Sequence, residues 1–481
     1  MAPVIVWFRR NLRFADNAAL AAAVESSRPI IPLYVVTEED AGSASRWWLH
    51  HSLASLDREL QQRGSGLVIR SGAAVDVLQD VAEESGAGGI FFARRYEPAS
   101  RAEEEAIETT LDAGVDIHAF DDSLLHHPQT VMTQGGTPFR VFTPFWRAAN
   151  SLGEPPSPDE APDAVEFAEN LPASQRLDDL DLLPRAPDWA QGLRNTWNPG
   201  EPGGLNRIDE LEAVVQDYAE GRDRPDLDAT SRLSPHLHFG EVSVRQVWHS
   251  VRGFEARLQA SSGAEALLRQ LYWRDFSAYL LYHSPKLPSE PLREEFNAFP
   301  WSDDEGLLRA WQKGQTGYPI VDAGMRQLWA TGWMHNRVRM IVASFLVKDL
   351  LIPWQQGADW FLDTLVDADL ANNSASWQWV AGCGTDAAPY FRIFNPVLQG
   401  KKFDPDGAYV RRWVPEIAGL PNEVIHEPWK ATTAALDAAG VRPGADYPAP
   451  IVDHGAARDA ALAAYQDIRG RRTSNDAPGS S

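Results

Sequence analysis

A surface that could hold a nucleobase is predicted in the segment QLYWRDFSAYL (270–280). Four of its residues follow the helical spacing i, i+3, i+4 and i+7, namely Gln270, Trp273, Arg274 and Ser277. Residues spaced in this way share one side of a helix, which here would combine an amide, a large π surface and a guanidinium. Such a side can stack a base, hydrogen-bond its edge and hold a phosphate. The same spacing also fits a helix that packs its Trp inward and leaves its Arg in water.

Carboxylates, an amide and two tryptophans are crowded into DADLANNSASWQW (367–379). Its first two turns contain Asp367, Asp369 and Asn373. Trp377 and Trp379 are two residues apart, so on a helix they point about 200° away from each other. They cannot serve one pocket in the same way, and we expect one to face the interior and the other a substrate cavity. A buried Asp near Arg339 would be paired with it.

The segment TGWMHNRVRM (331–340) places Asn336 and Met340 four residues apart, with Arg337 and Arg339 on flanking faces. Asn can read a base edge, and Met can fill an irregular apolar pocket. A basic surface helix has the same pattern, so both interpretations stay open.

The segment TSRLSP (230–235), with Tyr218 about a dozen residues earlier, could hold a phosphate. Hydroxyls and backbone N–H groups beside an Arg, where a loop leads into a helix, are suited to phosphate oxygens. An ordinary helix cap is the alternative.

The first 120 residues alternate between apolar strands and helices. Strands are expected at residues 3–8, 29–36, 67–70, 89–93 and 115–120, and helices at 17–27, 45–63, 75–85 and 98–113, with Asp16 as the first N-cap. This order predicts a doubly wound, parallel α/β sheet of the Rossmann-like kind. No Gly-rich dinucleotide fingerprint follows a strand, so NAD is not indicated.

The rest of the chain divides by composition. We predict an α/β domain at 1–130, a linker rich in Pro and Asp/Glu at 131–203, an all-helical domain at 204–472 and a disordered tail at 473–481. The predicted fold class is therefore α/β followed by all-α.

Composition limits the partners and the compartment. Cys383 is the only Cys, which excludes a disulfide, a Cys-ligated zinc or an iron–sulfur cluster within one chain. No apolar run is long enough to span a membrane, and arginines interrupt the N-terminus, so a cytoplasmic protein is expected. The net charge of −23 argues against nucleic acid. Residues 151–200 have ten acidic and three basic side chains, whereas residues 381–430 have six of each, so a local basic surface is possible.

Taken together and in this order, the motifs resemble the photolyase/cryptochrome family over essentially the whole chain. The matching stretches are WFRRNLRFADNAAL (7–20), TSRLSPHLHFG (230–240), GQTGYPIVDAGMRQLWATGWMHNRVRM (314–340), ASFLVKDLL (343–351) and ASWQWVAGCGTDAAPYFRIFNPVLQGKKFD (375–404). The resemblance implies an N-terminal α/β domain and a helical domain that holds FAD, in agreement with the pattern of the residues.

The resemblance also implies roles for individual residues. FAD contacts would be Tyr218, Thr230, Ser231, Arg232, Leu233, Ser234, Arg339, Asp367, Ala368, Asp369 and Asn373, with Arg339 and Asp367 as an ion pair and Asn373 beside flavin N5. Electron transfer to FAD would use Trp301, Trp354 and Trp377. DNA and its lesion would contact Arg222, Gln270, Trp273, Arg274, Asn336, Arg337, Met340, Trp379 and Gln399.

The implied activity is light-driven repair of cyclobutane pyrimidine dimers in UV-damaged DNA. The expected protein is a monomer that requires no metal and has no membrane partner. Excited, reduced flavin gives an electron to the flipped-out dimer, the ring splits and the electron returns. Asn336 and Met340 favour cyclobutane dimers, because eukaryotic-type (6-4) enzymes have histidines there. The iron–sulfur (6-4) branch needs four cysteines.

Two positions depart from the family pattern. Gln270 stands where enzymes acting on cyclobutane dimers usually have Glu, and Leu267 where some bacterial members have Trp. Glutamine can still hydrogen-bond a pyrimidine edge but cannot ionise, so we expect lesion binding to survive and stabilisation of the reduced dimer to weaken by about 1 kcal/mol.

Gln270 also keeps alternatives open, namely a photolyase with impaired or altered lesion specificity and a cryptochrome-like blue-light receptor. An electron-transfer flavoprotein without a DNA substrate is a third alternative. The segment SASRWWLHHSLASLD (43–57) resembles members that use a methenyltetrahydrofolate antenna, with 8-hydroxy-deazaflavin as the other candidate. Nucleoid association is expected when DNA is bound.

Overall fold

The structure, a computed structural model, describes residues 1–37, 42–111, 114–386 and 392–475. It forms two compact units. The first consists of Met1–Ala219, Thr230–Pro285 and Val366–Asp369, and the second of Glu220–Ala229, Lys286–Leu365 and Leu370–Ser481. The predicted domain boundaries, which follow sequence pattern, stay predictions.

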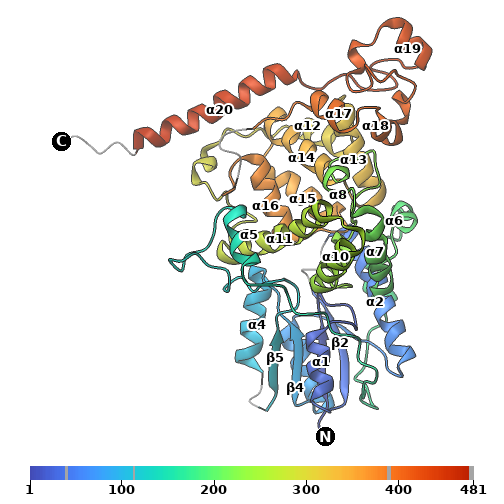
Figure 1. Cartoon of the computed structure of the whole chain (residues 1–481), viewed down its shortest axis with the longest axis vertical. Coiled ribbons are helices and arrows are strands. Elements are labelled where there is room, and N and C mark those ends of the chain that lie inside the picture. The colour runs from blue at the N-terminus through green and yellow to red at the C-terminus, as the bar shows by residue number, and fades with distance from the viewer. Residues whose placement is uncertain (38–41, 112–113, 387–391, 476–481) are drawn as a thin grey trace, which may run out of the picture. The chain divides into compact units, whose positions relative to one another are not determined.

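A five-stranded parallel sheet forms the centre of the first unit (Figure 1). Its strands are β1 (Val4–Phe8), β2 (Ile30–Val36), β3 (Val68–Ser71), β4 (Gly89–Ala93) and β5 (Asp116–Phe120), in the order β3-β2-β1-β4-β5. The central strands are buried along their whole length, as near-continuous apolar runs in a parallel sheet require. All five predicted strands are therefore confirmed.

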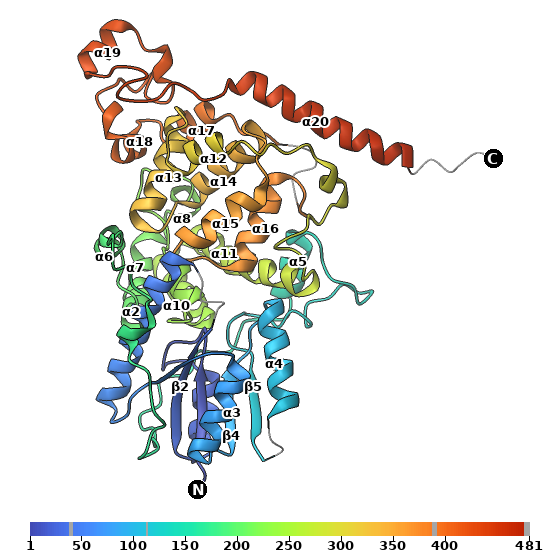
Figure 2. The same cartoon turned by 180° about the vertical axis from the view of Figure 1, so that it is seen from behind.

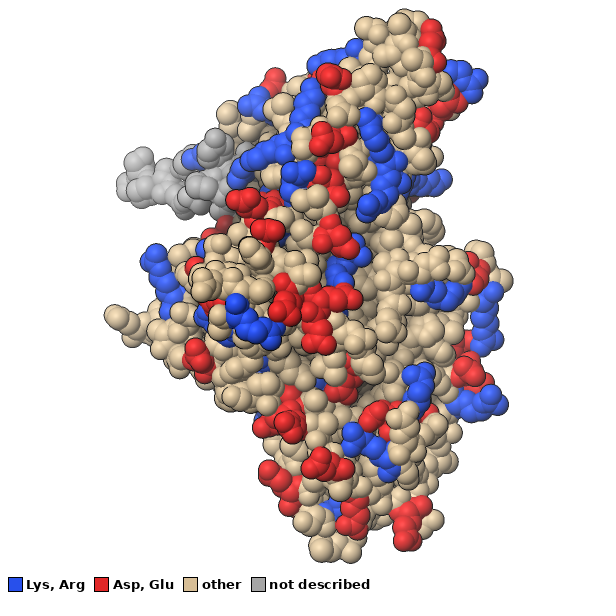
Figure 3. All heavy atoms as spheres, turned by 45° about the vertical axis from the view of Figure 1, so that its right-hand side comes forward, with Lys and Arg blue, Asp and Glu red and all other residues tan. Residues whose placement is uncertain are grey.

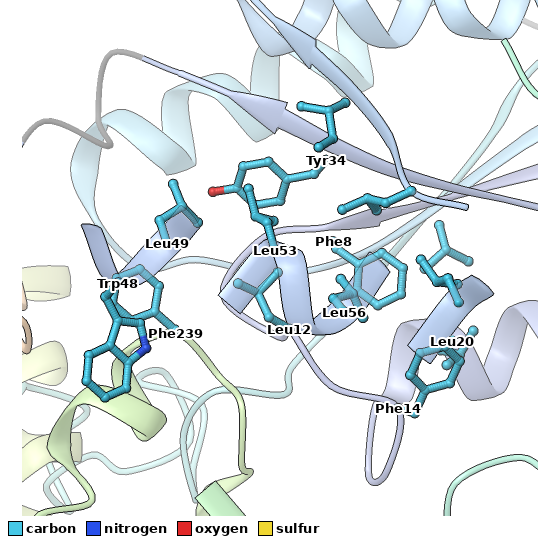
Figure 4. Close-up of a cluster of buried hydrophobic side chains, with 14 of the residues drawn as sticks. Phe8, Leu12, Phe14, Leu20, Tyr34, Trp48, Leu49, Leu53, Leu56 and Phe239 are labelled. Atoms are coloured by element: carbon cyan, nitrogen blue, oxygen red, sulfur yellow. The ribbon is translucent and has the colours of Figure 1, made fainter. Parts of the chain in front are cut away.

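Helices cover both faces of this sheet. They are α1 (Ala18–Glu25), α2 (Ser43–Gln62), α3 (Ala74–Ser85) and α4 (Pro98–Thr110). Alternate β1 residues enter two separate cores. Val4 and Phe8 pack with α1 and α2, whereas Ile5 packs with α3 and α4. Figure 4 shows the first of these cores, where Trp48 of α2 lies stacked on Phe239. The sheet is doubly wound, as predicted.

The first helix begins one residue later than expected. Asn17 is the N-cap of α1, and its side chain accepts a hydrogen bond from the Leu20 backbone N–H. The predicted cap, Asp16, instead has a left-handed φ of 54° and accepts a 2.9 Å hydrogen bond from the Asp159 N–H. The prediction of Asp16 as the cap was wrong because this carboxylate is used in a long-range contact.

The segment predicted as a linker contains short elements, namely α5 (Phe142–Asn150), η1 (Leu177–Leu180) and α6 (Gln191–Thr196). Phe167 forms a bridge with Ile30 of β2, so part of the segment runs along the sheet. Phe142 and Phe145 of α5 are fully buried. This stretch belongs to the first unit and packs against the rest of it at these points.

The remaining helices of the first unit surround a third apolar core. They are α7 (Glu201–Val214), α8 (Tyr218–Gly221, whose last two residues belong to the second unit), α9 (Ser234–His238), α10 (Val244–Leu258) and α11 (Ser261–His283). Ser243 and Gln246 form a capping box that fixes the start of α10.

The second unit is built of helices. They are η2 (Glu294–Ala298), α12 (Glu305–Gln312), α13 (Pro319–Thr331), α14 (Asn336–Ser344), the π-helical turn η3 (Phe345–Asp349), α15 (Trp354–Thr364), α16 (Leu370–Ala381), α17 (Pro396–Phe403), α18 (Ala408–Trp413), η4 (Pro415–Ile417), η5 (Pro428–Lys430), α19 (Thr433–Ala439) and α20 (His454–Asn475). Helix α20 continues to Asn475, two residues beyond the predicted start of the tail. The rest of that tail lies outside the described residues.

Acidic and basic side chains are interspersed on the face drawn in Figure 3. Among the described residues, no helix is both long and apolar enough to cross a membrane.

Candidate functional site

The predicted base-binding side of residues 270–277 lies on one helix, α11, in the first unit. Gln270 is half-buried, and its Nε2 donates to the Ala266 carbonyl at 2.9 Å. The Arg274 guanidinium donates to the Ser123 carbonyl at 2.5 Å and to the Leu237 carbonyl at 3.4 Å. Arg274 therefore ties a loop and α9 to α11 through hydrogen bonds, and its contact to DNA stays a prediction.

Trp273 is held by a close aromatic stack with Phe142, which was not predicted from the sequence. The Phe142 ring lies 3.6 Å from the Trp273 ring, centroid to centroid, with only 7° between their planes. Phe142 is buried, while Trp273 is half-buried. One face of the indole is thus covered by Phe142, so a stacked base would have to use the other. The aromatic content of FTPFW (142–146) was the available signal.

The TSRLSP segment forms a loop that leads into α9, as predicted. Tyr218 and Leu233 are buried, and the Ser231 carbonyl accepts a 2.9 Å hydrogen bond from Arg207. Arg232 has a left-handed φ of 49°. A non-glycine residue in this region is uncommon and is often found at ligand-binding positions.

His238, at the end of α9, is a site residue that the sequence did not reveal. Its Nδ1 lies 3.6 Å from Asp369 Oδ2, too far for a direct hydrogen bond. Neither ring nitrogen has a hydrogen-bond partner among the described residues, although the ring is buried. Burial, together with the nearby Arg10 guanidinium, lowers the pKa of His238 to about 4. A neutral, unsatisfied imidazole beside a carboxylate fits a polar ligand at this point.

Asp367 and Ala368 stand beside Asp369 in the same short segment of the first unit. The Asp367 side chain is buried. Arg339 belongs to the second unit, where its Nε donates to the Met334 carbonyl at 2.7 Å. The ion pair expected between Arg339 and Asp367 stays a prediction.

The predicted Asn336 and Met340 pair lies on α14, in the first two turns. Asn336 is exposed, Met340 is half-buried, and Arg337 Nη1 lies 3.9 Å from the Met340 sulfur. Arg337 forms a 2.8 Å ion pair with Asp223 and lies 4.4 Å above the Phe403 ring. An amide, a thioether and a guanidinium are therefore adjacent on this helix.

Two further residues predicted to contact DNA belong to the second unit. Arg222 precedes Asp223 in the loop that pairs with Arg337, and Gln399 lies on α17, the helix of Phe403. Both side chains are half-buried. Their positions are compatible with a surface role, which stays a prediction.

Helix α16 presents Trp377 and Trp379 to different surroundings, as predicted. Trp377 is buried, whereas Trp379 is half-buried. Asn373 is buried, and its Nδ2 donates to the Ala358 carbonyl at 3.0 Å. Between the tryptophans, Gln378 donates to the Leu287 and Glu290 carbonyls at 2.8 and 2.7 Å. These bonds fix the rotation of α16 about its axis.

The three tryptophans predicted for electron transfer lie in the second unit. Trp354 and Trp377 are buried, and Trp301 is half-buried. Within the described part of the chain, their rings do not contact one another directly. Instead Trp377 packs edge-on against Phe361 at 5.1 Å and Trp311 at 6.2 Å.

Two protein-family models match parts of this chain. Residues 4–163 match the family model described as DNA photolyase, and residues 267–467 match that of the FAD binding domain of DNA photolyase. The chain is 50% identical to a deoxyribodipyrimidine photo-lyase of Agrobacterium fabrum, over 97% of this chain and 98% of the relative. It is 41% identical to Cryptochrome-1 of Arabidopsis thaliana, over 93% of this chain and 68% of that protein.

Among solved structures, a bacterial class III photolyase from Agrobacterium tumefaciens matches with a TM-score of 0.95 and 50% identity, covering 98% of both chains. An α/β sheet followed by helices that match an FAD-binding domain defines a class of flavoproteins. The chain belongs to the DNA photolyase family.

Proposed function

We propose that this protein repairs cyclobutane pyrimidine dimers in DNA by light-driven electron transfer. The observation that carries this proposal is its 50% identity, over nearly the full length of both chains, to a deoxyribodipyrimidine photo-lyase. The side chains expected at a lesion support it. Trp273 offers one aromatic face on α11, and Asn336 lies beside Arg337 and Met340 on α14.

FAD is the cofactor, since the second family model describes an FAD-binding domain. Its contacts are the residues of the family pattern, namely Tyr218, Thr230, Ser231, Arg232, Leu233, Ser234, Arg339, Asp367, Ala368, Asp369 and Asn373. The buried His238 lies beside Asp369, and its two ring nitrogens have no hydrogen-bond partner within the described ranges, which fits a polar group of such a ligand. When bound and reduced, FAD supplies the electron that splits the dimer on illumination.

The chain's own residues hold the lesion outside the duplex. By the family pattern, Trp273 and Trp379 offer aromatic faces to the dimer, Gln270 offers a hydrogen bond to a pyrimidine edge, and Asn336 and Met340 make further contacts to the lesion. Moving the dimer out of the duplex costs a few kcal/mol, and this cost is lowest for damaged bases. The damage itself therefore contributes to the selectivity for dimer-containing DNA. Arg222, Arg274, Arg337 and Gln399 hold the flanking strand.

Trp377, Trp354 and Trp301 keep FAD reduced by passing electrons from the surface. The burial of Trp354 and Trp377 excludes water from most of this route. Asn373, whose amide is fixed by the Ala358 carbonyl, stands on the same helix as Trp377. By the family pattern, it is the residue that would lie beside flavin N5.

The proposal includes an antenna, methenyltetrahydrofolate, with 8-hydroxy-deazaflavin as the alternative. The segment 43–57 lies on α2, where Trp47 and Trp48 are core residues, so an antenna would contact other side chains of that helix. We further propose a monomer in the cytoplasm, associated with the nucleoid when bound to DNA. Absorption spectra of extracted pigments distinguish the two antennas.

The first test is dark binding of two oligonucleotides that differ only by one thymine cyclobutane dimer. The dimer-containing strand should bind at least about 10³-fold more tightly at fixed salt. Trp273→Ala should weaken dimer binding by about 10- to 100-fold, because stacking on one base contributes about 1–3 kcal/mol, and should leave undamaged DNA unaffected. Equal affinity of the wild type for both strands would overturn the proposal.

A further inference from the structure

We propose that residues 123–153, together with Arg269, form a surface that binds DNA phosphates beside the lesion. None of these residues belongs to the set that the family motifs assign to DNA. The inference rests on the proposed function, since it takes Trp273 as a wall of the lesion pocket. It concerns the first unit alone.

The charge pattern of the sequence singles out this stretch. Residues 123–153 contain no Asp or Glu, whereas residues 154–188, directly after them, contain ten. The whole chain has 67 acidic residues among 481, so a stretch of this length would be expected to contain about four. Acidic side chains are thus missing at a place where they would repel a phosphate backbone.

The arginines of this stretch are not neutralised. Arg140 and Arg147 are exposed and Arg269 is half-buried, and none of the three forms an ion pair with a carboxylate of the described residues. In the following stretch, by contrast, exposed arginines are paired with nearby carboxylates, as in Arg176–Asp178 at 4.0 Å. Three cations that pair with no carboxylate in the described part of the chain, in a protein of net charge −23, indicate a local positive surface.

Helix α5 places this surface beside the lesion wall. It packs along α11, and the two helices lie side by side in both Figure 1 and Figure 2. Phe142 stacks on Trp273 at 3.6 Å, and Phe145 lies 5.0 Å from Phe276, centroid to centroid. The Tyr279 hydroxyl accepts a 2.8 Å hydrogen bond from the Phe139 N–H, which anchors the loop before α5.

Arg269 joins the two helices. Its guanidinium lies 4.9 Å above the Trp146 ring and 5.4 Å above the Phe142 ring. It stands one helical turn before Trp273 on α11, and both side chains contact the Phe142 ring. These two cation–π contacts hold the guanidinium beside α5 without neutralising its charge.

This chemistry fits the DNA backbone better than a base edge. Guanidinium groups bind phosphate oxygens in a bidentate manner, and most protein–DNA hydrogen bonds go to phosphates and sugars. Neutral hydroxyls of the same stretch, such as the exposed Thr137, can add contacts without charge. Such contacts position the duplex and do not read its sequence.

The experiment compares two double variants of the full-length holoprotein, Arg140→Ala/Arg147→Ala and the control Arg176→Ala/Arg185→Ala. All four arginines belong to the first unit and are exposed, so both variants change the net charge equally and neither should disturb the core. Affinities for dimer-containing and undamaged duplexes are measured at several salt concentrations, and thermal unfolding verifies folding.

The inference predicts that the slope of log K against log[salt] becomes shallower by about 0.9 per lost contact in Arg140→Ala/Arg147→Ala only. Two contacts correspond to about a tenfold smaller change in affinity over a fourfold change in salt. The loss should be equal for damaged and undamaged duplexes. Arg269→Gln should lower the slope by about one further contact.

Equal slopes in the two double variants would overturn the inference, provided the wild type still prefers the dimer. If the wild type shows no preference for the dimer, the proposed function fails instead. In that case a changed slope in Arg140→Ala/Arg147→Ala would still support phosphate binding by this surface, and an unchanged slope would overturn it as well.

Discussion

Gln270 is the residue at which this chain departs most clearly from the family pattern. Its Nε2 donates to the Ala266 carbonyl one turn earlier, which leaves Oε1 available as an acceptor. Only one of the two Nε2 hydrogens is used in this way, and the neutral N–H that remains stabilises negative charge on a dimer less than the O–H of a protonated carboxyl in the same place would. The residue is therefore suited to binding the lesion more than to stabilising its reduced form.

We predict that Gln270→Glu raises the yield of repaired dimers per photon by up to about fivefold, equivalent to about 1 kcal/mol. Repair of a single-dimer oligonucleotide under limiting blue light measures this yield. Gln270→Met, of similar length but without hydrogen bonds, serves as the control and should lower it. A yield that is unchanged or lower in Gln270→Glu would show that the carboxyl has no such role here.

Asp275 gives a pH-dependent prediction at the residue scale. This carboxylate is buried on α11 and accepts hydrogen bonds from the Leu125 and His126 N–H groups. Burial raises its pKa from 3.8 to about 7, although Arg274 and these two hydrogen bonds oppose the change. The folded state keeps the proton while the unfolded chain loses it, so folding stability falls as pH rises from about 4 to about 7.

Asp275→Asn, which cannot ionise, should remove this loss. Between pH 5 and pH 8, the free energy of unfolding of the wild type should fall by about 2–3 kcal/mol relative to that of the variant. Urea unfolding at both pH values measures the difference. A constant difference between the two proteins would mean that Asp275 does not carry the raised pKa.

At the scale of elements, Gly357 allows α15 to lie close to α16. A methyl group on Gly357 would stand 2.1 Å from Trp377 Cη2 and 2.6 Å from Leu346 Cδ2. Since the Trp377 ring is buried between Phe361 and Trp311, it has no free space to move into. The absence of a side chain at this position is thus part of how Trp377 is positioned.

Gly357→Ala should lower the free energy of unfolding by about 1–3 kcal/mol and slow the light-driven reduction of FAD, because Trp377 must shift. Gly253→Ala, on α10 with open space around the added methyl, should instead stabilise the protein by about 0.5–1 kcal/mol. Urea unfolding and flavin absorbance under blue light with an external thiol measure both. An unaltered reduction rate in Gly357→Ala would argue against the role of Trp377.

The sequence predicts elements well where local pattern decides them. The five strands follow from apolar runs that only a sheet buried on both faces accommodates, and the side shared by Gln270 and Trp273 follows from helical spacing. It fails where distant contacts decide. The Phe142–Trp273 stack joins residues 131 positions apart, and Phe142 lies in the stretch that was predicted as a linker from its prolines. Asp16 does not cap α1, because its carboxylate accepts a hydrogen bond from the Asp159 N–H.

For the candidate site, residue types and their helices could be predicted, but surroundings could not. His238 gives no sequence signal, since a His near a helix end is common, and only burial beside Asp369 makes it notable. Likewise, spacing alone does not reveal that Arg140 and Arg147 form no ion pair with any carboxylate that the structure describes. Such features depend on which side chains tertiary packing brings together.

At the scale of the whole molecule, a net charge of −23 should act in opposite directions on folding and on DNA binding. Without DNA, salt screens the repulsion among acidic side chains, so the melting temperature should rise by a few °C between about 10 mM and about 150 mM salt. Over the same range, affinity for DNA should fall. Thermal unfolding and binding titrations measure the two effects, and a melting temperature that falls with added salt would contradict this account of the charge.

The most direct test of the proposed activity is to count restored thymines. The reduced holoprotein is mixed with an oligonucleotide that contains one thymine cyclobutane dimer, and half of the sample is exposed to blue light while the other half stays dark. Chromatography then measures intact thymines in each half. We predict restoration in the illuminated half only. If FAD is bound and reduced but no thymines are restored in the light, the central claim is contradicted.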